Sequence, residues 1–198
     1  KRVAICSDHP FFTYDDWFIG TTPMDKGIPE ENKSSSLTFK YNNLQSLQEL
    51  FEKYPNEIAC VILEPATFQS PCSTSCANNL LEKPDCKSCP FKQTNFLHQV
   101  KALCKQHGAV FILDEMITGF RWDLQGAMKT YDVEPDLATF GKAMANGFAL
   151  SALVGKREIM ELGGIRKEGS ERVFLISTTH GSEMSSFGAF IKIGRAHV

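Results

Sequence analysis

The sequence predicts an α/β fold in which a mostly parallel sheet is flanked by helices. Two short runs, Ile58–Leu63 and Ala109–Leu113, are apolar without alternation, which is typical of parallel strands buried on both faces. A segment with apolar residues at helical spacing lies between these runs. Further strand-like and helix-like segments alternate on either side, and this alternation indicates an α/β layer rather than a bundle or a sandwich.

The first part of the chain predicts two strands and one helix. Arg2–Cys6 is an apolar strand candidate, and Ile58–Leu63 is another that stops at Glu64-Pro65. Between them, a helix is expected where apolar residues recur at helical spacing, and Pro55 ends it. These positions are Leu44, Leu47, Leu50 and Phe51.

The second part predicts two helices and three strands. The first helix precedes Gly108, a plausible cap, and its apolar face consists of Phe96, Leu97, Val100, Leu103 and Cys104. The strand Ala109–Leu113 follows and ends in Asp114-Glu115. We expect a second helix over Asp123–Tyr131 and short strands at Leu137–Phe140 and Ala152–Val154.

Composition limits the class of protein. The 198 residues are 42% hydrophobic and 22% charged, with a net charge of −2, which is ordinary for a soluble globular domain. Such a charge gives no reason to expect nucleic acid or an anionic membrane as a partner. No apolar run approaches the roughly 20 residues of a transmembrane helix, and no leader peptide is visible at Lys1. We therefore expect a cytoplasmic protein.

Both ends of the chain predict a fragment. A strand candidate begins at once after Lys1, which is not Met, and residues 193–198 (IGRAHV) look like a translated sequencing adaptor. We therefore expect residues 1–192 to form a domain that is incomplete at both ends, and residues 193–198 to be a non-native tail.

Polar side chains follow the predicted strands. Glu64 and Asp114 end two of them and Lys142 comes just after a third, at the sheet edge where ligands of parallel α/β folds bind. A carboxylate ending an apolar strand needs a cationic partner. Pyridoxal phosphate requires a carboxylate opposite its pyridine nitrogen and a lysine amine for its aldehyde. Asp114 and Lys142 suit this need, although a structural ion pair or cap would use the same residue types.

Two long motifs then identify a family. Residues 111–121 (FILDEMITGFR) resemble the Asp-Glu-Val/Met signature of class III aminotransferases, and residues 136–147 (DLATFGKAMANG) resemble their cofactor-lysine signature. The similarity continues through Ser151–Gly155. Glutamate-1-semialdehyde aminomutase-like members are the most similar.

The resemblance implies the large domain of the aspartate aminotransferase-like (type I pyridoxal-phosphate) fold. Lys142 would form the Schiff base with pyridoxal 5'-phosphate and move a proton as the catalytic residue. Asp114 would pair with the pyridine nitrogen and Met116 would pack on the ring. His9, after the first strand, is expected in the cofactor site, although which aromatic ring stacks there stays open. Thr178 would reach the cofactor phosphate of a neighbouring subunit, which implies a homodimer.

The implied reaction is amino-group transfer between a small-molecule amino donor and a carbonyl acceptor, by a transaminase or an aminomutase. A racemase or decarboxylase outcome with the same cofactor is an alternative. The family's phosphate-binding loop lies upstream of the first strand and its C-terminal domain downstream. We therefore expect the isolated fragment to be inactive.

A cysteine-rich insert at residues 66–95 departs from the family pattern. Its Cys-x3-Cys and Cys-x2-Cys pairs suit tetrahedral zinc. They are Cys72, Cys76, Cys86 and Cys89. Free thiols or an iron–sulfur cluster are the alternatives, and a zinc with four protein ligands would be structural. A non-catalytic, zinc-stapled interaction module is therefore the rival hypothesis from another class of protein.

Overall fold

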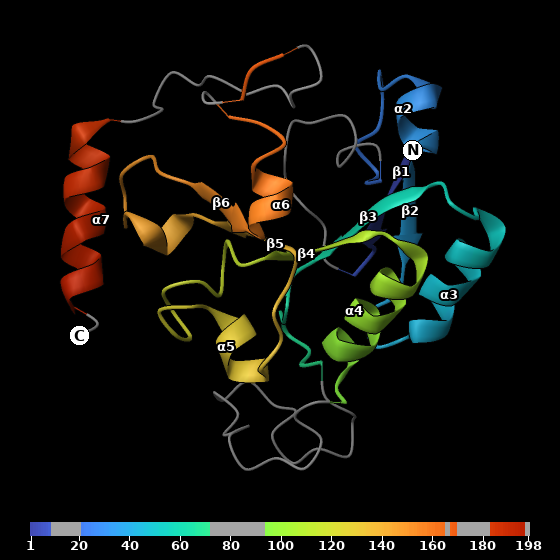
Figure 1. The fold of residues 1–198 in the computed structure, drawn as a ribbon, viewed down its shortest axis with the longest axis horizontal. Helices are drawn as coiled ribbons and strands as arrows, with labels where there is room; N and C mark the ends of the chain where they lie inside the picture. The colour runs from blue at the N-terminus through green and yellow to red at the C-terminus, as the bar shows by residue number, and fades with distance from the viewer. Residues whose placement is uncertain (9–20, 72–93, 165–166, 170–182, 197–198) are drawn as a thin grey trace.

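A computed structural model describes residues 1–8, 21–71, 94–164, 167–169 and 183–196. Its centre is a six-stranded sheet in the order β2-β1-β3-β4-β5-β6 (Figure 1). The strands are β1 (Arg2–Cys6), β2 (Ser36–Phe39), β3 (Ile58–Leu63), β4 (Val110–Asp114), β5 (Leu137–Phe140) and β6 (Ala152–Gly155). The first five are parallel and β6 runs antiparallel to β5 at one edge. The expected mostly parallel sheet is thereby confirmed.

Helices connect most of these strands. They are α2 (Glu30–Ser34), α3 (Leu44–Lys53), α4 (Phe96–His107), α5 (Ala127–Tyr131), α6 (Arg157–Met160) and α7 (Met184–Ala196), with a 3-10 turn, η2, at Lys142–Met144. No helix in the described part of the chain is long and apolar enough to cross a membrane.

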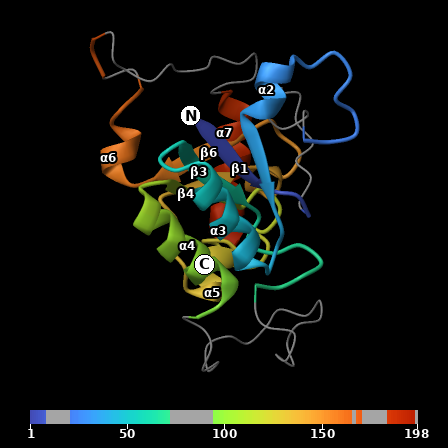
Figure 2. The ribbon, with the colours of Figure 1, turned by 90° about the vertical axis from the view of Figure 1, so that its right-hand side faces the viewer.

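One face of the sheet carries the main core. Helices α3 and α4 pack side by side on it, as Figures 1 and 2 both show, and α5 joins them through Ala127 and Tyr131. Their fully buried side chains include Leu47 of α3 and Val100 of α4. Because successive strand residues point to opposite faces, Val61 and Leu63 of β3 meet these helices.

The sequence encodes the ends of these two helices locally. Asn43 and Asn95 each cap a helix N-terminus by accepting the backbone N–H three residues later, at Ser46 and His98. Gly108 ends α4 in the left-handed conformation, with φ 65°, where glycine bears no Cβ penalty.

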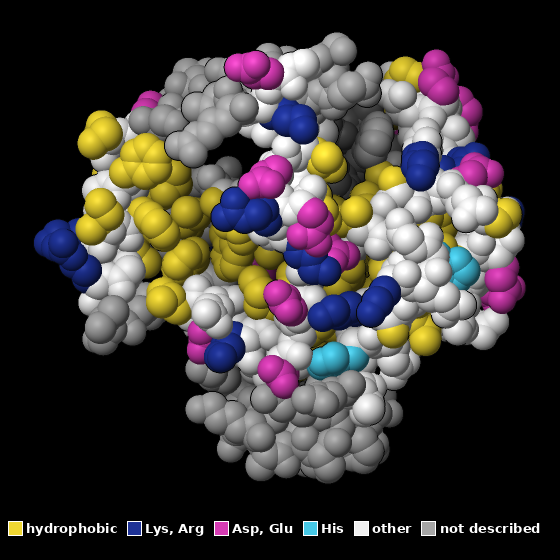
Figure 3. Space-filling view, viewed as in Figure 1, with side chains coloured by type: hydrophobic (Ala, Val, Ile, Leu, Met, Phe, Trp, Pro, Cys, Tyr) yellow, Lys and Arg dark blue, Asp and Glu magenta, His cyan; other side chains and the backbone are white. Residues whose placement is uncertain are grey.

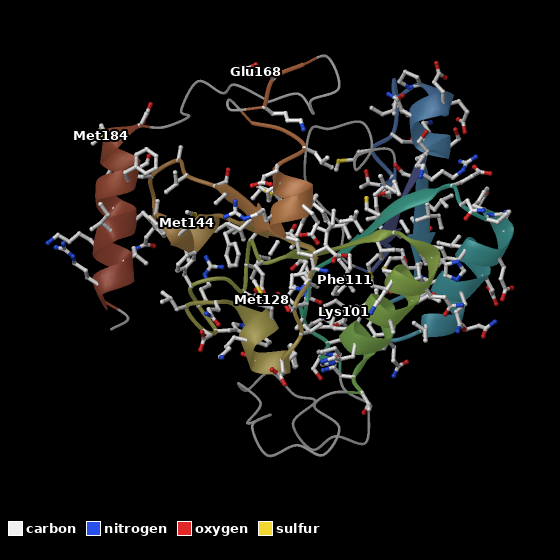
Figure 4. The ribbon with its side chains drawn as sticks, in the orientation of Figure 1. Lys101, Phe111, Met128, Met144, Glu168 and Met184 are labelled. Atoms are coloured by element: carbon white, nitrogen blue, oxygen red, sulfur yellow. The ribbon has the colours of Figure 1, made fainter. Side chains whose placement is uncertain are left out.

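The opposite face of the sheet has a smaller apolar cluster. Val3, Ile5 and Ile62 are buried there, with Cys60 and Ile112 partly buried beside them. A third cluster forms near β5 and β6, where Phe140 packs with Met144 of η2 and Met128 of α5. Figure 4 labels the two methionines. The ring of Phe190 brings α7 to this cluster by packing edge-on against Phe120.

Several elements differ from the sequence expectations. Helix α5 starts at Ala127 rather than Asp123, because Gly126 adopts φ 78° and ψ −169°, which no helix allows. Strand β4 includes Asp114 and so lies one residue later than expected. Elements α2, β2, α6 and α7 were not predicted. Helix α7 also extends through Ile193–Ala196, within the segment that the sequence predicts to be a non-native tail.

Candidate functional site

Three strands bring polar residues together at their carboxyl ends. Glu64 follows β3, Asp114 ends β4, and Lys142 comes two residues after β5. These strands are adjacent in the sheet and parallel. The positive charge of Lys142 lowers the pKa of both carboxyl groups. The structure therefore assembles the group of residues that the sequence predicted at this edge.

The strand register puts a row of polar side chains on one face. Leu63 of β3 pairs with Leu113 of β4, so Glu64 and Asp114 are the next residues along the two strands. Asp114 in turn pairs with Thr139 of β5. Because Leu63 and Leu113 point into the main core, these three polar side chains point to the opposite face of the sheet. The helices α3, α4 and α5 therefore support the site from behind.

Within the described part of the chain, hydrogen bonds hold one oxygen of Asp114. The backbone N–H of Met116 and the hydroxyl of Thr139 both donate to Oδ1, at 2.9 and 3.1 Å. Oδ2 accepts no hydrogen bond from a described residue. Burial raises the pKa of Asp114, while these two bonds and the charge of Lys142 lower it in part. An oriented carboxylate with one unused oxygen suits a cationic N–H donor.

Glu64 is the second carboxyl group of the site. Its Oε2 is buried and has no hydrogen-bond partner in the described part of the chain. Burial, and next the nearby charge of Asp114, raise the pKa of Glu64 to about 7, although Lys142 acts in the opposite direction. A buried polar atom without a partner is costly, which suggests that it meets a group from outside these residues.

Lys142 sits in the turn between β5 and β6 and is exposed. Its φ of 43° is unusual for a residue with a side chain, and such strain clusters at functional sites. Its amine makes no ion pair or hydrogen bond with a described residue. The amine therefore lies at the same sheet edge as two carboxyl groups, without an ion-pair or hydrogen-bond partner among the described residues.

Met116 and Gly141 pack against each other beside Lys142. A Cβ on Gly141 would overlap the thioether and methyl of Met116. The absence of a side chain at Gly141 therefore gives Met116 its place, next to the residue that carries the amine.

Glu115 is a residue whose role the sequence did not suggest. It is fully buried and points to the face opposite Asp114. Its carboxylate accepts the backbone N–H groups of Ala127 and Met128, at 2.9 and 2.7 Å, and the hydroxyl of Thr118. It therefore caps α5 and closes residues 116–126 into a compact loop. The alternation of side chains along a strand could have predicted that Glu115 points to the face opposite Asp114. It could not have predicted the hydrogen-bond partners of Glu115.

The other predicted site residues lie outside the described part. These are His9, Thr178 and the four cysteines Cys72, Cys76, Cys86 and Cys89. Among the described residues, no three His, Cys, Asp or Glu side chains are arranged to hold a metal ion. The zinc and partner-subunit assignments therefore stay predictions.

Comparison with known proteins identifies the family. The sequence profile described as "Aminotransferase class-III" matches residues 89–188, half of the chain, including Asp114 and Lys142. The chain belongs to the class-III aminotransferase family. Within that family, glutamate-1-semialdehyde 2,1-aminomutase from Francisella philomiragia is 39% identical over 139 residues, which is 70% of this chain and 28% of that protein.

Solved structures show the same fold. An omega-transaminase from Sphaerobacter thermophilus superposes with a TM-score of 0.74 at 20% identity, covering 98% of this chain and 43% of the other. The FumI protein of Sphingopyxis sp. MTA144, in its PLP internal aldimine form, gives a TM-score of 0.72 at 21% identity, covering 98% and 41%. The type I α/β fold expected from the motifs is thereby confirmed. This class-III chain spans less than half the length of these structures.

Proposed function

We propose that this chain forms part of the cofactor site of a pyridoxal-phosphate enzyme that transfers amino groups. The observation that carries the proposal is the convergence of Asp114 and Lys142 at the carboxyl edge of the sheet, where no described residue engages Oδ2 of Asp114 or the amine of Lys142. Family membership and the similarity to an aminomutase support it. The chain alone spans only 28% of that relative, so the activity belongs to the full-length protein.

The described residues fit this cofactor. The cofactor, when bound, supplies an electron sink and carries the amino group between substrates. Oδ2 of Asp114 would hold the proton on the pyridine nitrogen, because the two hydrogen bonds to Oδ1 fix the carboxylate. Met116 is suitably placed to pack against the ring.

Lys142 would have two roles. Its Nζ would bind the cofactor aldehyde in the resting enzyme, and once freed by substrate it would take up and return the proton at the substrate α-carbon. The absence of any competing partner for the amine among the described residues supports both roles. The unusual positive φ of Lys142 would fix the direction in which this long side chain approaches.

An aminomutase is the reaction we favour, because the aminomutase relative shares 39% identity with this chain. In such a reaction the same molecule gives and receives the amino group. Transamination between separate amino donors and carbonyl acceptors is the second candidate, since the similar folds include an omega-transaminase. A full-length homodimer is also proposed. Exposed apolar side chains on β6 and α7 support it (Figure 3), namely Leu153, Val154, Met184, Phe187 and Ile191.

Visible absorbance tests this proposal directly. The full-length protein is mixed with pyridoxal phosphate beside its Lys142→Ala variant and a Lys129→Ala control, which removes an exposed lysine from α5. We expect a yellow band in the parent and the control that the Lys142→Ala variant lacks. A folded parent without a band would refute the proposal. Turnover of glutamate-1-semialdehyde without an added acceptor would then separate an aminomutase from a transaminase.

Zinc at the cysteine-rich insert is a separate proposal. It rests on the spacing of the two cysteine pairs. Metal analysis of the purified full-length protein tests it, with about one zinc per chain expected. A double variant, Cys86→Ser with Cys89→Ser, should lose the metal but keep the yellow band, because the proposed zinc is structural.

A further inference from the structure

A third ionisable group lies beside the two residues to which the proposed function assigns roles. Glu64 follows Leu63, Asp114 follows Leu113, and these leucines pair across β3 and β4. The two carboxyl groups therefore share one face and one edge of the sheet. Lys142 completes the group from the turn after β5, and its charge acts on both carboxyl groups.

Glu64 differs from Asp114 in how its oxygens are satisfied. Asp114 is oriented by a backbone N–H and by the hydroxyl of Thr139. Oε2 of Glu64 is buried, and no described residue donates to it. A protonated Glu64 would bear less of this cost, because a neutral carboxyl group loses less on burial than a charged one.

The surroundings of Glu64 indicate when it ionises. Asp114 from β4 disfavours its charge and Lys142 favours it. From β1, the nearest carboxylate along the chain is Asp8, whose charge is already engaged by Lys40 at 3.6 Å and by the backbone N–H of Tyr41 at 2.8 Å. Burial is the largest influence on Glu64 and opposes ionisation. The balance places its titration close to neutral pH.

We propose that Glu64 is a positioning residue of the cofactor site. In its neutral form, Glu64 keeps a proton beside Asp114. When Glu64 releases this proton to solvent, its negative charge stabilises the protonated form of the nitrogen at Lys142. This inference rests on the proposed function. Two like carboxylates at one edge cannot both ionise freely. Asp114 would thus stay the anion that faces the pyridine nitrogen, while Glu64 adjusts the charge of the site with pH.

A spectral pH titration of the loaded, full-length protein tests this inference. The visible band would be followed from about pH 5.5 to 9 in the parent, in Glu64→Gln, and in Glu57→Gln. Glu57 is a matched control, because it lies before the same strand at the opposite end, paired with Arg2. An ionised Glu64 stabilises a nearby cation, so its removal should lower the midpoint of the band titration by about 1 pH unit.

The outcomes separate this inference from the proposed function. A lower midpoint and a sharper titration in Glu64→Gln, with Glu57→Gln titrating like the parent, would support the inference. A Glu64→Gln protein that binds the cofactor and titrates like the parent would overturn it and leave the proposed function intact. A folded parent without any band would refute both.

Glu64→Asp is a second variant in case Glu64→Gln does not fold. It keeps the carboxyl group, so the midpoint of its visible-band titration should stay near that of the parent. If Glu64→Asp instead binds the cofactor but lowers the midpoint as much as loss of the carboxyl group is expected to, Glu64 does not act through its charge and the inference is wrong.

Discussion

The carboxylate of Glu115 occupies the space that a side chain on Gly126 would need. A Cβ built on Gly126 overlaps both carboxylate oxygens, and Gly126 itself has φ 78° and ψ −169°. This backbone region is used almost only by glycine. The contact closes residues 116–126, which begin two residues after Asp114, against the start of α5. The stability of this loop therefore depends on a residue twelve positions away from Asp114.

We expect Gly126→Ala to destabilise the protein by about 3 kcal/mol, because backbone strain and overlap with a buried carboxylate add together. Gly108→Ala is the control. Gly108 also has a positive φ of 65°, but a Cβ there meets nothing within 4 Å, so a cost of about 1 kcal/mol is expected. Thermal or denaturant unfolding of both variants measures the difference. Equal losses would show that the Glu115 carboxylate yields to the new methyl group.

The charge on Asp114 is expected to favour activity at the expense of stability. Asp114→Asn should lower amino-transfer turnover by about 10² or more, the scale found when one well-placed electrostatic group is removed. The same change should raise the melting temperature of the cofactor-free protein near pH 7, because burial raises the pKa of Asp114 and disfavours its charge.

Thr139→Val is the milder companion of this variant. It removes the 3.1 Å hydrogen bond to Oδ1 but keeps the carboxylate and the bond from Met116. A net loss of about 1 kcal/mol corresponds to a fall in turnover of less than about tenfold. If Thr139→Val reduced turnover as much as Asp114→Asn, orientation rather than charge would be the main contribution of Asp114.

Much of the sheet could be predicted because its strands are encoded locally. Ile58–Leu63 is apolar throughout, and the structure confirms both of its ends. Strand β2 has only four residues, of which Leu37 and Phe39 are buried. That strand depends on pairing with β1, which lies about thirty residues earlier. Helix α7 likewise contacts the rest of the fold through Phe190, whose partner Phe120 is distant in sequence.

The site was predictable where chemistry follows from a motif. Asp114 and Lys142 were expected from strand ends and from family signatures, and the pairing of β4 with β5 puts them at one edge of the sheet. The neighbouring residues that hydrogen-bond to this site could not be predicted, because their positions depend on strand register and on turns. Thr139 meets Asp114 only because β4 and β5 pair as they do. Glu115 depends on the turn at Gly126, which no helical pattern anticipates.

Glu64 gives a pH dependence of stability even without the cofactor. Its pKa rises from an ordinary 4.5 to about 7 on folding, mainly through burial. The folded state therefore binds the proton more tightly, so stability falls as pH rises from about 4.5 to 7. We expect Glu64→Gln to match the parent near pH 4 and to be more stable by about 1 kcal/mol at pH 8, a figure reduced for partial solvent exposure. Melting curves of the cofactor-free, full-length protein at both pH values check this, and a lower stability at pH 8 would contradict it.

The contribution of Asp136 to stability has the opposite dependence on pH. Asp136 directly precedes β5. Burial raises the pKa of Asp136, but hydrogen bonds from Lys156 and from the N–H of Phe111 outweigh this effect. The pKa therefore lies below the ordinary value of 3.8. Its contribution is therefore present above about pH 4 and is lost as pH falls through the lower folded-state pKa. Asp136→Asn should cost about 1 kcal/mol at pH 7 and much less near pH 2.

The exposed pair of Arg157 and Glu161 provides the control for this prediction. Glu161→Gln should change stability by less than about 0.5 kcal/mol at either pH, since solvent screens such pairs. Both variants can be followed by acid unfolding monitored by circular dichroism. A loss in Asp136→Asn that does not vary with pH would show that the amide replaces the carboxylate badly for steric reasons, rather than through charge.

Gly141→Ala tests whether the position of Met116 matters to the proposed cofactor site. Gly141 has φ −173°, an extended conformation open to any residue, so alanine adds no backbone strain there. Its new methyl group would overlap the flexible end of Met116, which can move aside at a cost of about 1 kcal/mol or less. We therefore expect an almost unchanged melting temperature but a weaker hold on the cofactor, by about tenfold, measured as the dissociation constant from the visible band. Met116→Ala should weaken binding to a similar degree, and the double variant should add little to either, because both changes remove the same contact. If Gly141→Ala bound the cofactor as tightly as the parent, Met116 would have no part in holding it.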